Sequence, residues 1–261
     1  MGIVNTTPDS FSDGGRFLNT DAAVSHALEM VEQGADILDI GGESTRPGAA
    51  EVSQQEELDR VIPVIERICK ETSTPISIDT YKPEVMSAAL AAGASMINDV
   101  NGLQAEGAIA VAAQAQVPVC IMHMQNNPRT MQEAPRYENV VDEVFDFLQH
   151  RIAQCAEHGL ARELIITDPG IGFGKTLAHN LALLKAVPRL KDKLGCEVLI
   201  GVSRKSMIDM LLQREVDQRL AASVGLAVQA ALNGAKILRV HDVAETHDAV
   251  RAVEAVVSAE V

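Results

Sequence analysis

The stretch PISIDTYKPEVMSAALAAGASMIND, residues 75–99, indicates the fold of the whole chain. Two short apolar runs, 75–79 and 95–99, enclose a longer segment with helical spacing. Each run is continuously apolar rather than alternating in polarity, which is typical of a parallel strand covered on both faces. The stretch therefore predicts one strand–helix–strand unit, with a polar residue near the end of each strand.

The same pattern continues in both directions from this unit. Six further runs have this character: 2–5, 36–40, 117–124, 163–168, 197–203 and 236–242. Helical segments separate the runs, and a helical stretch at 243–258 follows the last one. Eight strands with seven crossovers and a terminal helix predict an α/β fold of the TIM (β/α)₈ barrel type. A doubly wound open sheet is the alternative.

Two of the helical segments have clear boundary signals. Ser53 and Glu56 form a capping box, after which apolar residues follow the 3.6-residue period as far as Cys69. Pro63 falls inside this pattern and predicts a kink. Gly34 is the expected C-cap of the helix before residue 36.

Length and composition agree with a single folded domain, which we place at residues 1–261. The 261 residues are close to the size of one TIM barrel, and the content of 47% apolar and 22% charged residues is that of a globular protein. A net charge of −14 argues against nucleic-acid and anionic membrane partners. No apolar run approaches the length of a membrane span, and no secretory signal is evident.

The cysteines indicate a cytoplasmic protein. They have no zinc or redox spacing, and we expect reduced, buried thiols at Cys69, Cys120, Cys155 and Cys196.

The apolar runs end in polar or ionisable residues. These are Asn5, Asp39, Asp79, Asn98, His123, Asp168, residues 203–206, Arg239 and His241. Because the carboxyl ends of barrel strands converge on one face, we predict that these side chains line one site. Any one of them could instead be a turn residue or a helix cap. A capping role does not explain the basic residues in this set. We interpret His123 as a core residue rather than a metal ligand.

The charges on this face predict the chemistry of the ligand. Four cations lie at its loop positions: Arg46, Lys205, Arg239 and His241. This local reversal of sign in an acidic chain predicts an anionic group on the ligand. The carboxylates of Asp79 and Asp168 would suit the paired N–H donors of a nitrogen heterocycle. Residues 6–16 and 42–50 are long, polar and glycine-containing, so we expect lids there rather than ordinary connections.

Two familiar motifs are incomplete. GIGFGKT (170–176) has Pro169 where a Walker loop needs glycine, and GVSRK (201–205) has lysine where a nucleophile elbow needs glycine.

Eight longer motifs together resemble the dihydropteroate synthases, a pterin-binding TIM-barrel family blocked by sulfonamides. They are MGIVNTTPDSFSDGG, DIGGESTRPGA, ISIDTYKP, INDVNG, MHMQNNPRTMQ, ITDPGIGFGKT, GVSRKS and LRVHDV. The resemblance implies that 6-hydroxymethyl-7,8-dihydropterin pyrophosphate and p-aminobenzoate are condensed to 7,8-dihydropteroate and pyrophosphate. It also suggests a homodimer. Family members commonly carry a β-hairpin before the first strand, whereas this sequence begins at MGIVN.

The resemblance assigns roles by position. The residues implied to hold or adjoin the pterin are Asp79, Asn98, Asp168, Lys205, Asp39 and Met122. Those implied at the pyrophosphate are Arg239, His241, Thr45 and Arg46. Those implied at p-aminobenzoate and in the two loops are Asp9, Phe11, Thr45, Arg46, Pro47, Phe173 and Ser206. Asn5 is implied to hold Mg²⁺ together with the pyrophosphate.

The expected mechanism is an SN1-like substitution, because the reduced pterin can spread the positive charge that develops as the C–O bond breaks. The first two loops match the family pattern, so we expect sensitivity to sulfonamides. Two other functions remain as alternatives: a methyltetrahydrofolate-binding barrel that serves a corrinoid protein, and a pterin-binding paralogue without turnover.

Overall fold

A computed structural model describes residues 1–6, 16–45, 48–126 and 130–259 of the chain. In this part of the chain eight parallel strands form one sheet in which spatial order follows chain order. The strands are β1 (Gly2–Asn5), β2 (Leu38–Gly41), β3 (Ile76–Asp79), β4 (Met96–Asp99), β5 (Val119–Met122), β6 (Ile165–Asp168), β7 (Glu197–Ile200) and β8 (Ile237–Leu238). A parallel bridge joins Gly2 of the first strand to Val240, two residues after the last strand. The sheet is therefore a closed barrel, and the open-sheet alternative is wrong.

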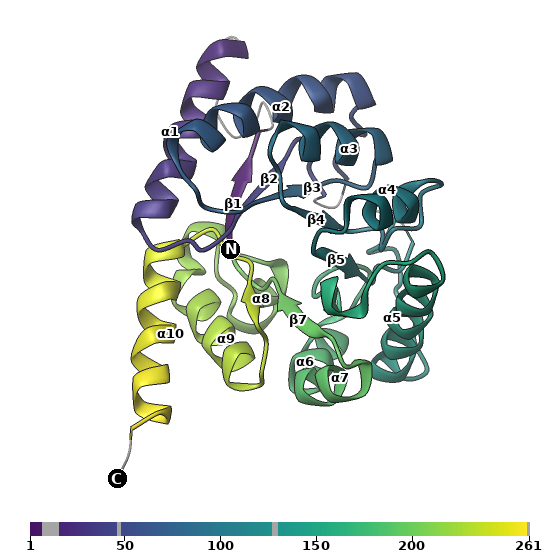
Figure 1. Cartoon of the computed structure of the whole chain (residues 1–261). Coiled ribbons are helices and arrows are strands. Elements are labelled where there is room, and N and C mark those ends of the chain that lie inside the picture. The colour runs from purple at the N-terminus through teal and green to yellow at the C-terminus, as the bar shows by residue number, and fades with distance from the viewer. Residues whose placement is uncertain (7–15, 46–47, 127–129, 260–261) are drawn as a thin grey trace.

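The helices form an outer ring around the strands (Figure 1). They are α1 (Arg16–Glu32), α2 (Gln54–Glu71), α3 (Pro83–Ala92), α4 (Ala108–Ala115), α5 (Val140–Glu157), α6 (Leu177–Lys185), α7 (Val187–Leu194), α8 (Ser206–Leu212), α9 (Leu220–Leu232) and α10 (Val243–Val257). Short 3₁₀ turns occupy η2 (Arg162–Leu164) and η3 (Val216–Gln218). The crossovers after β6 and after β7 each contain two helices. The TIM-barrel prediction is confirmed.

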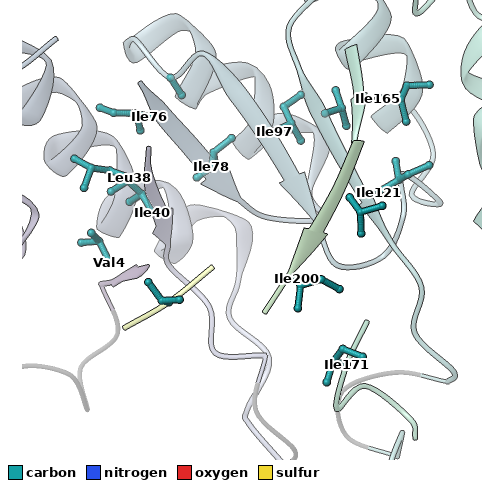
Figure 2. Packing of buried hydrophobic residues seen from close by; sticks show 14 of the residues in the cluster. Val4, Leu38, Ile40, Ile76, Ile78, Ile97, Ile121, Ile165, Ile171 and Ile200 are labelled. Atoms are coloured by element: carbon teal, nitrogen blue, oxygen red, sulfur yellow. The ribbon is translucent and has the colours of Figure 1, made fainter. Parts of the chain in front are cut away.

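Side chains point alternately outward and inward along each strand, and these two sets form two separate cores. The outward side chains, among them Leu38, Ile40, Ile78 and Ile97, pack between strands and helices (Figure 2). The inward side chains near the strand starts form a smaller apolar cluster around Met96, Cys120 and Leu199. The inward positions nearer the carboxyl ends are polar, and there the barrel holds buried Asp39, Asp79 and Asn98. The fold thus places charged groups directly above an apolar floor.

The predicted boundaries of α1 and α2 hold at the described ends. Ser53 Oγ accepts a hydrogen bond from the Glu56 amide at 3.2 Å, which is the N-cap of α2. Gly34 adopts a φ of 96° just after α1, and the Ala35 amide donates to Met30 at 2.9 Å. Helix α2 continues through Pro63.

One expectation about the cysteines is wrong. Cys120, Cys155 and Cys196 are buried free thiols, but Cys69 is exposed. Cys69 follows Ile68, the last buried residue of α2, and one helical step of about 100° turns it away from the buried stripe. In the described residues no helix has both the length and the apolar character needed to cross a bilayer.

Candidate active site

Arg239 connects two carboxylates at the carboxyl end of the barrel. It follows β8, and its Nε lies 2.6 Å from Oδ2 of Asp39 on β2. Its Nη2 lies 2.6 Å from Oδ2 of Asp79, the last residue of β3. Asn98 on β4 donates from Nδ2 to the same Asp39 oxygen at 3.1 Å. Three strands and the residue just after β8 therefore contribute to one largely buried hydrogen-bonded cluster.

The cluster holds two carboxylates for one guanidinium. Burial raises the pKa of Asp79 to about 7, while Arg239 opposes that shift and Asp39 adds to it. Burial lowers the pKa of Arg239, but Asp39 and Asp79 outweigh this effect and raise it above its ordinary value. The guanidinium is therefore always charged. Asp39 Oδ1 is buried without a hydrogen-bond partner among the described residues, so it can accept an N–H from a ligand.

A second group of ionisable residues lies at the end of β6 and in the segment after β7. Burial raises the pKa of Asp168, the last residue of β6, and the ammonium of Lys205 opposes this shift. Lys205 precedes α8, donates to the Ile171 carbonyl and lies 4.7 Å from the centre of the Phe173 ring. Burial lowers the pKa of Lys205 to about 8, against the effect of Asp168. Aromatic, cationic and acidic groups thus adjoin one another here.

The two halves of the site meet between β7 and β8. Ser203 Oγ accepts the His241 amide at 3.2 Å and lies 3.0 Å from His241 Nδ1. Gly201 has no side chain, and a Cβ built there would lie 3.7 Å from both Lys205 Nζ and Arg239 Cβ. Lys205, Arg239 and His241 therefore gather at neighbouring strand ends, as the sequence predicts.

Other predicted residues lie on the same rim. Asn5 ends β1, is half-buried and pairs in register with Gly41, which in turn pairs with Asp79. Met122 is buried at the end of β5, in register with Asp168. Thr45 is half-buried in the segment after β2, and Ser206 is exposed at the start of α8. The predictions for Asp9, Phe11, Arg46 and Pro47 fall outside the described residues.

Lys175 is a buried lysine that the sequence reasoning missed. Its Nζ donates to the Phe173 carbonyl at 2.9 Å and lies 3.0 Å from His123 Nδ1. Burial lowers the pKa of Lys175 to about 7 and, together with Lys175, that of His123 to about 3. His123 is thus a neutral, buried residue, as expected. The signal for Lys175 was its place in GIGFGKT, the glycine-rich loop that follows Asp168.

A second missed group fixes the loop after β4. Asp99 accepts the amides of Asn101 and Leu103 at 2.7 and 2.8 Å. Arg151 on α5 donates to the carbonyls of Gly102 at 2.6 Å and Leu103 at 2.5 Å. The Asp-Val-Asn-Gly sequence after Asn98 is a turn signal that could have indicated this role.

The fold and this polar rim define a class of enzyme. The profile of the family described as "Pterin binding enzyme" matches residues 1–241. The chain belongs to this family of pterin-binding enzymes.

Similar proteins narrow the class further. The dihydropteroate synthase of Escherichia coli K12 is 52% identical over 259 residues, which cover 99% of this chain and 92% of that protein. A structure of Xanthomonas albilineans dihydropteroate synthase with 4-aminobenzoic acid has a TM-score of 0.94 at 52% identity, covering 99% of this chain and 93% of that one. A Yersinia pestis dihydropteroate synthase in a sulfonamide complex has a TM-score of 0.93 at 50% identity, covering 99% and 94%. Within the family, this chain groups with the dihydropteroate synthases.

Proposed function

We propose that this chain condenses 6-hydroxymethyl-7,8-dihydropterin pyrophosphate with p-aminobenzoate, forming 7,8-dihydropteroate and releasing pyrophosphate. The observation that carries the proposal is the buried cluster of Arg239 with Asp39 and Asp79. It presents carboxylate oxygens to a ring with N–H donors, beside cations suited to a diphosphate. The similarity to dihydropteroate synthases supports this choice of substrates.

The pterin binds at the acidic half of the site. Asp79 and Asp168 accept N–H groups of the ring, Asn98 can both donate and accept, and Lys205 donates to a ring acceptor. Because Asp39 Oδ1 has no hydrogen-bond partner among the described residues, an incoming N–H would satisfy a buried acceptor at little desolvation cost.

The diphosphate leaves toward the cationic half. Arg239 and His241 stabilise the negative charge that accumulates on the leaving oxygens, while Asp79 and Asp168 stabilise the positive charge spread over the pterin. This separation of charge favours cleavage of the C–O bond before attack, an SN1-like course. The aromatic amine of p-aminobenzoate can release its proton after attack, so no strong base is needed.

Asn5 would hold Mg²⁺ together with the diphosphate. An amide oxygen is a hard ligand of the type Mg²⁺ accepts, and Mg²⁺ commonly completes its shell with substrate phosphates and water. The described residues contain no group of three or more His, Cys, Asp or Glu side chains placed to hold a metal ion, which fits a shared site better than a protein cage. The ion would supply additional positive charge to the leaving group.

The second substrate binds near Phe173, Ser206 and Thr45. Lys205 already lies over the Phe173 ring, so an aromatic ring and a cation are available to a benzoate at one place. Sulfonamides, which resemble p-aminobenzoate in shape, would compete there, and the Yersinia pestis relative with a bound sulfonamide supports this.

A homodimer is part of the proposal. A group of large exposed apolar side chains lies in the α8–α9 region, at Met210, Leu211, Leu212, Val216 and Leu220. Such a group is typical of a protein–protein interface. Light scattering should give twice the monomer mass, and Leu212→Glu should reduce it to the monomer. We also place the protein in the cytoplasm, because its four cysteines are free thiols.

The decisive experiment is a pyrophosphate-release assay with both substrates and Mg²⁺, with and without a sulfonamide. We expect turnover that requires p-aminobenzoate and Mg²⁺ and that the drug inhibits competitively with p-aminobenzoate. Positional isotope exchange of the bridging oxygen without p-aminobenzoate tests early C–O cleavage. Turnover without p-aminobenzoate dependence, or pterin binding without any turnover, would contradict the proposed reaction.

A further inference from the structure

An ionic cluster lies beside the site, at the base of the segment between β2 and α2. Lys82, in the loop after β3, donates from Nζ to one carboxylate oxygen each of Glu43 and Glu57. Glu43 follows β2, and Glu57 lies on α2. The side chains of Lys82 and Glu43 are each 13% exposed and that of Glu57 is 1% exposed, so water screens these ion pairs weakly.

Glu43 also joins the two ends of this segment. Its Oε1 accepts the amide of Val52 at 3.4 Å and the Tyr81 hydroxyl at 3.4 Å. Arg60 on α2 donates from Nη1 to the carbonyl of Gly42 at 2.7 Å. Residues 42, 43 and 52, at the start and end of the segment, are therefore held against α2 and the loop after β3.

Lys82 is the only cation in the described part of the cluster that contacts both Glu43 and Glu57. Burial lowers the pKa of Lys82, but the bonds to the two carboxylates outweigh this effect and raise it to about 12. The ammonium is therefore present at every physiological pH. Without it, two buried carboxylates would face each other, and Glu43 would be driven toward solvent.

We propose that Lys82 is a positioning residue that fixes the described ends of the β2–α2 segment, residues 42–45 and 52, and thereby sets the affinity for p-aminobenzoate. Thr45, assigned above to that substrate, lies two residues after Glu43, while Asp79, assigned to the pterin, lies three residues before Lys82. The ion pairs thus connect the strand end that binds one substrate to the segment that binds the other. The inference rests on the proposed function.

The test is steady-state kinetics of Lys82→Met with each substrate varied in turn. We expect KM for p-aminobenzoate to rise about tenfold while KM for the pterin diphosphate changes less than about twofold, since Asp79 and Asp168 stay in place. Lys82→Arg, which keeps the charge and offers several donors, should restore most of the affinity. The matched control is Lys191→Met, which removes an exposed ion pair to Glu197 at the start of β7, and it should leave both KM values unchanged.

A second variant covers the case in which Lys82→Met does not fold. Glu43→Met removes the oxygens that accept from Val52, Tyr81 and Lys82 but leaves Lys82 paired with the buried Glu57. It should raise KM for p-aminobenzoate selectively, and adding Lys82→Met should raise it little further, because both changes remove one interaction. Equal changes in both KM values, or no change in either, would overturn the inference. An inactive wild-type protein would instead overturn the proposed function.

Discussion

Arg239 Nη2 lies 2.6 Å from Asp79 Oδ2, although 160 residues separate the two in the sequence. The pair joins a cation assigned to the diphosphate to a carboxylate assigned to the pterin. A carboxylate has two oxygens, so Asp79 can accept an N–H group of the pterin while Oδ2 keeps its contact with the guanidinium. The two parts of the substrate would therefore bind to groups that already contact each other.

The ion pairs of Arg239 should matter for stability as well as for activity. Arg239→Met leaves Asp39 and Asp79 buried without their cation, and we expect the free energy of unfolding to fall by about 3–5 kcal/mol. Urea denaturation measures this change. The control is Arg189→Met, which removes an exposed ion pair to Asp142 and should change the free energy by less than about 1 kcal/mol. Equal losses in the two variants would contradict the structural role of Arg239.

The loss of activity at high pH should follow the deprotonation of Lys205. Because the pKa of Lys205 is lowered to about 8, its positive charge is lost as pH rises through that value. We expect kcat/KM for the pterin diphosphate to fall above about pH 8. The arginine in Lys205→Arg keeps its charge at higher pH. The fall in kcat/KM of this variant should therefore begin at a higher pH, even if its maximal rate is lower. An unchanged pH dependence in this variant would assign the titration to another group.

Asp99 should make the protein less stable as pH rises. Burial raises its pKa from 3.8 to about 7, so the folded chain retains a proton that the unfolded chain has released. This stabilisation is complete below about pH 4 and is lost as pH rises through about 7. In this range the contribution of Asp99 to the free energy of unfolding falls by up to about 1.4 kcal/mol per pH unit. Thermal or urea unfolding across this range should show a shallower slope in Asp99→Asn.

The matched control for that measurement is Asp248→Asn on α10, where the side chain is 88% exposed. Its unfolding profile should have the slope of the wild type. The same slope in Asp99→Asn would show that the Asp99 carboxyl does not retain its proton on folding.

Replacement by alanine should change the free energy of unfolding in opposite directions at two glycines. Gly170 has a φ of 70°, and a Cβ there would lie 1.9 Å from the His123 carbonyl oxygen, so Gly170→Ala should lower the free energy of unfolding by more than about 3 kcal/mol. Gly225 lies in α9, and apart from its own helix backbone no atom would lie within 4 Å of a Cβ built there. Gly225→Ala should raise the free energy by about 0.5–1 kcal/mol. Urea denaturation of both variants, side by side, checks the sign of each change.

The sequence predicted the barrel and the residues of its rim because both depend on local pattern. Each strand is a short apolar run, and the polar residue near its end is next to it in the chain. The ion pairs depend instead on register between distant strands, as for Arg239 and Asp39, which are 200 residues apart. Nothing local to Lys175 or Lys82 shows which carboxylate or carbonyl it reaches. The burial of Cys69 was predicted wrongly because one residue along a helix is enough to turn a side chain from the buried face to the exposed face.

The inner cluster of Asp39, Asp79 and Arg239 has a consequence for drug resistance. A compound that binds in this part of the barrel has to present N–H donors to the two carboxylates. A ring with only hydrogen-bond acceptors along its edge would be repelled by them. A mutation that excludes such a compound by replacing either aspartate would also remove a partner of the buried guanidinium. Escape from an inhibitor bound here would therefore weaken the enzyme itself.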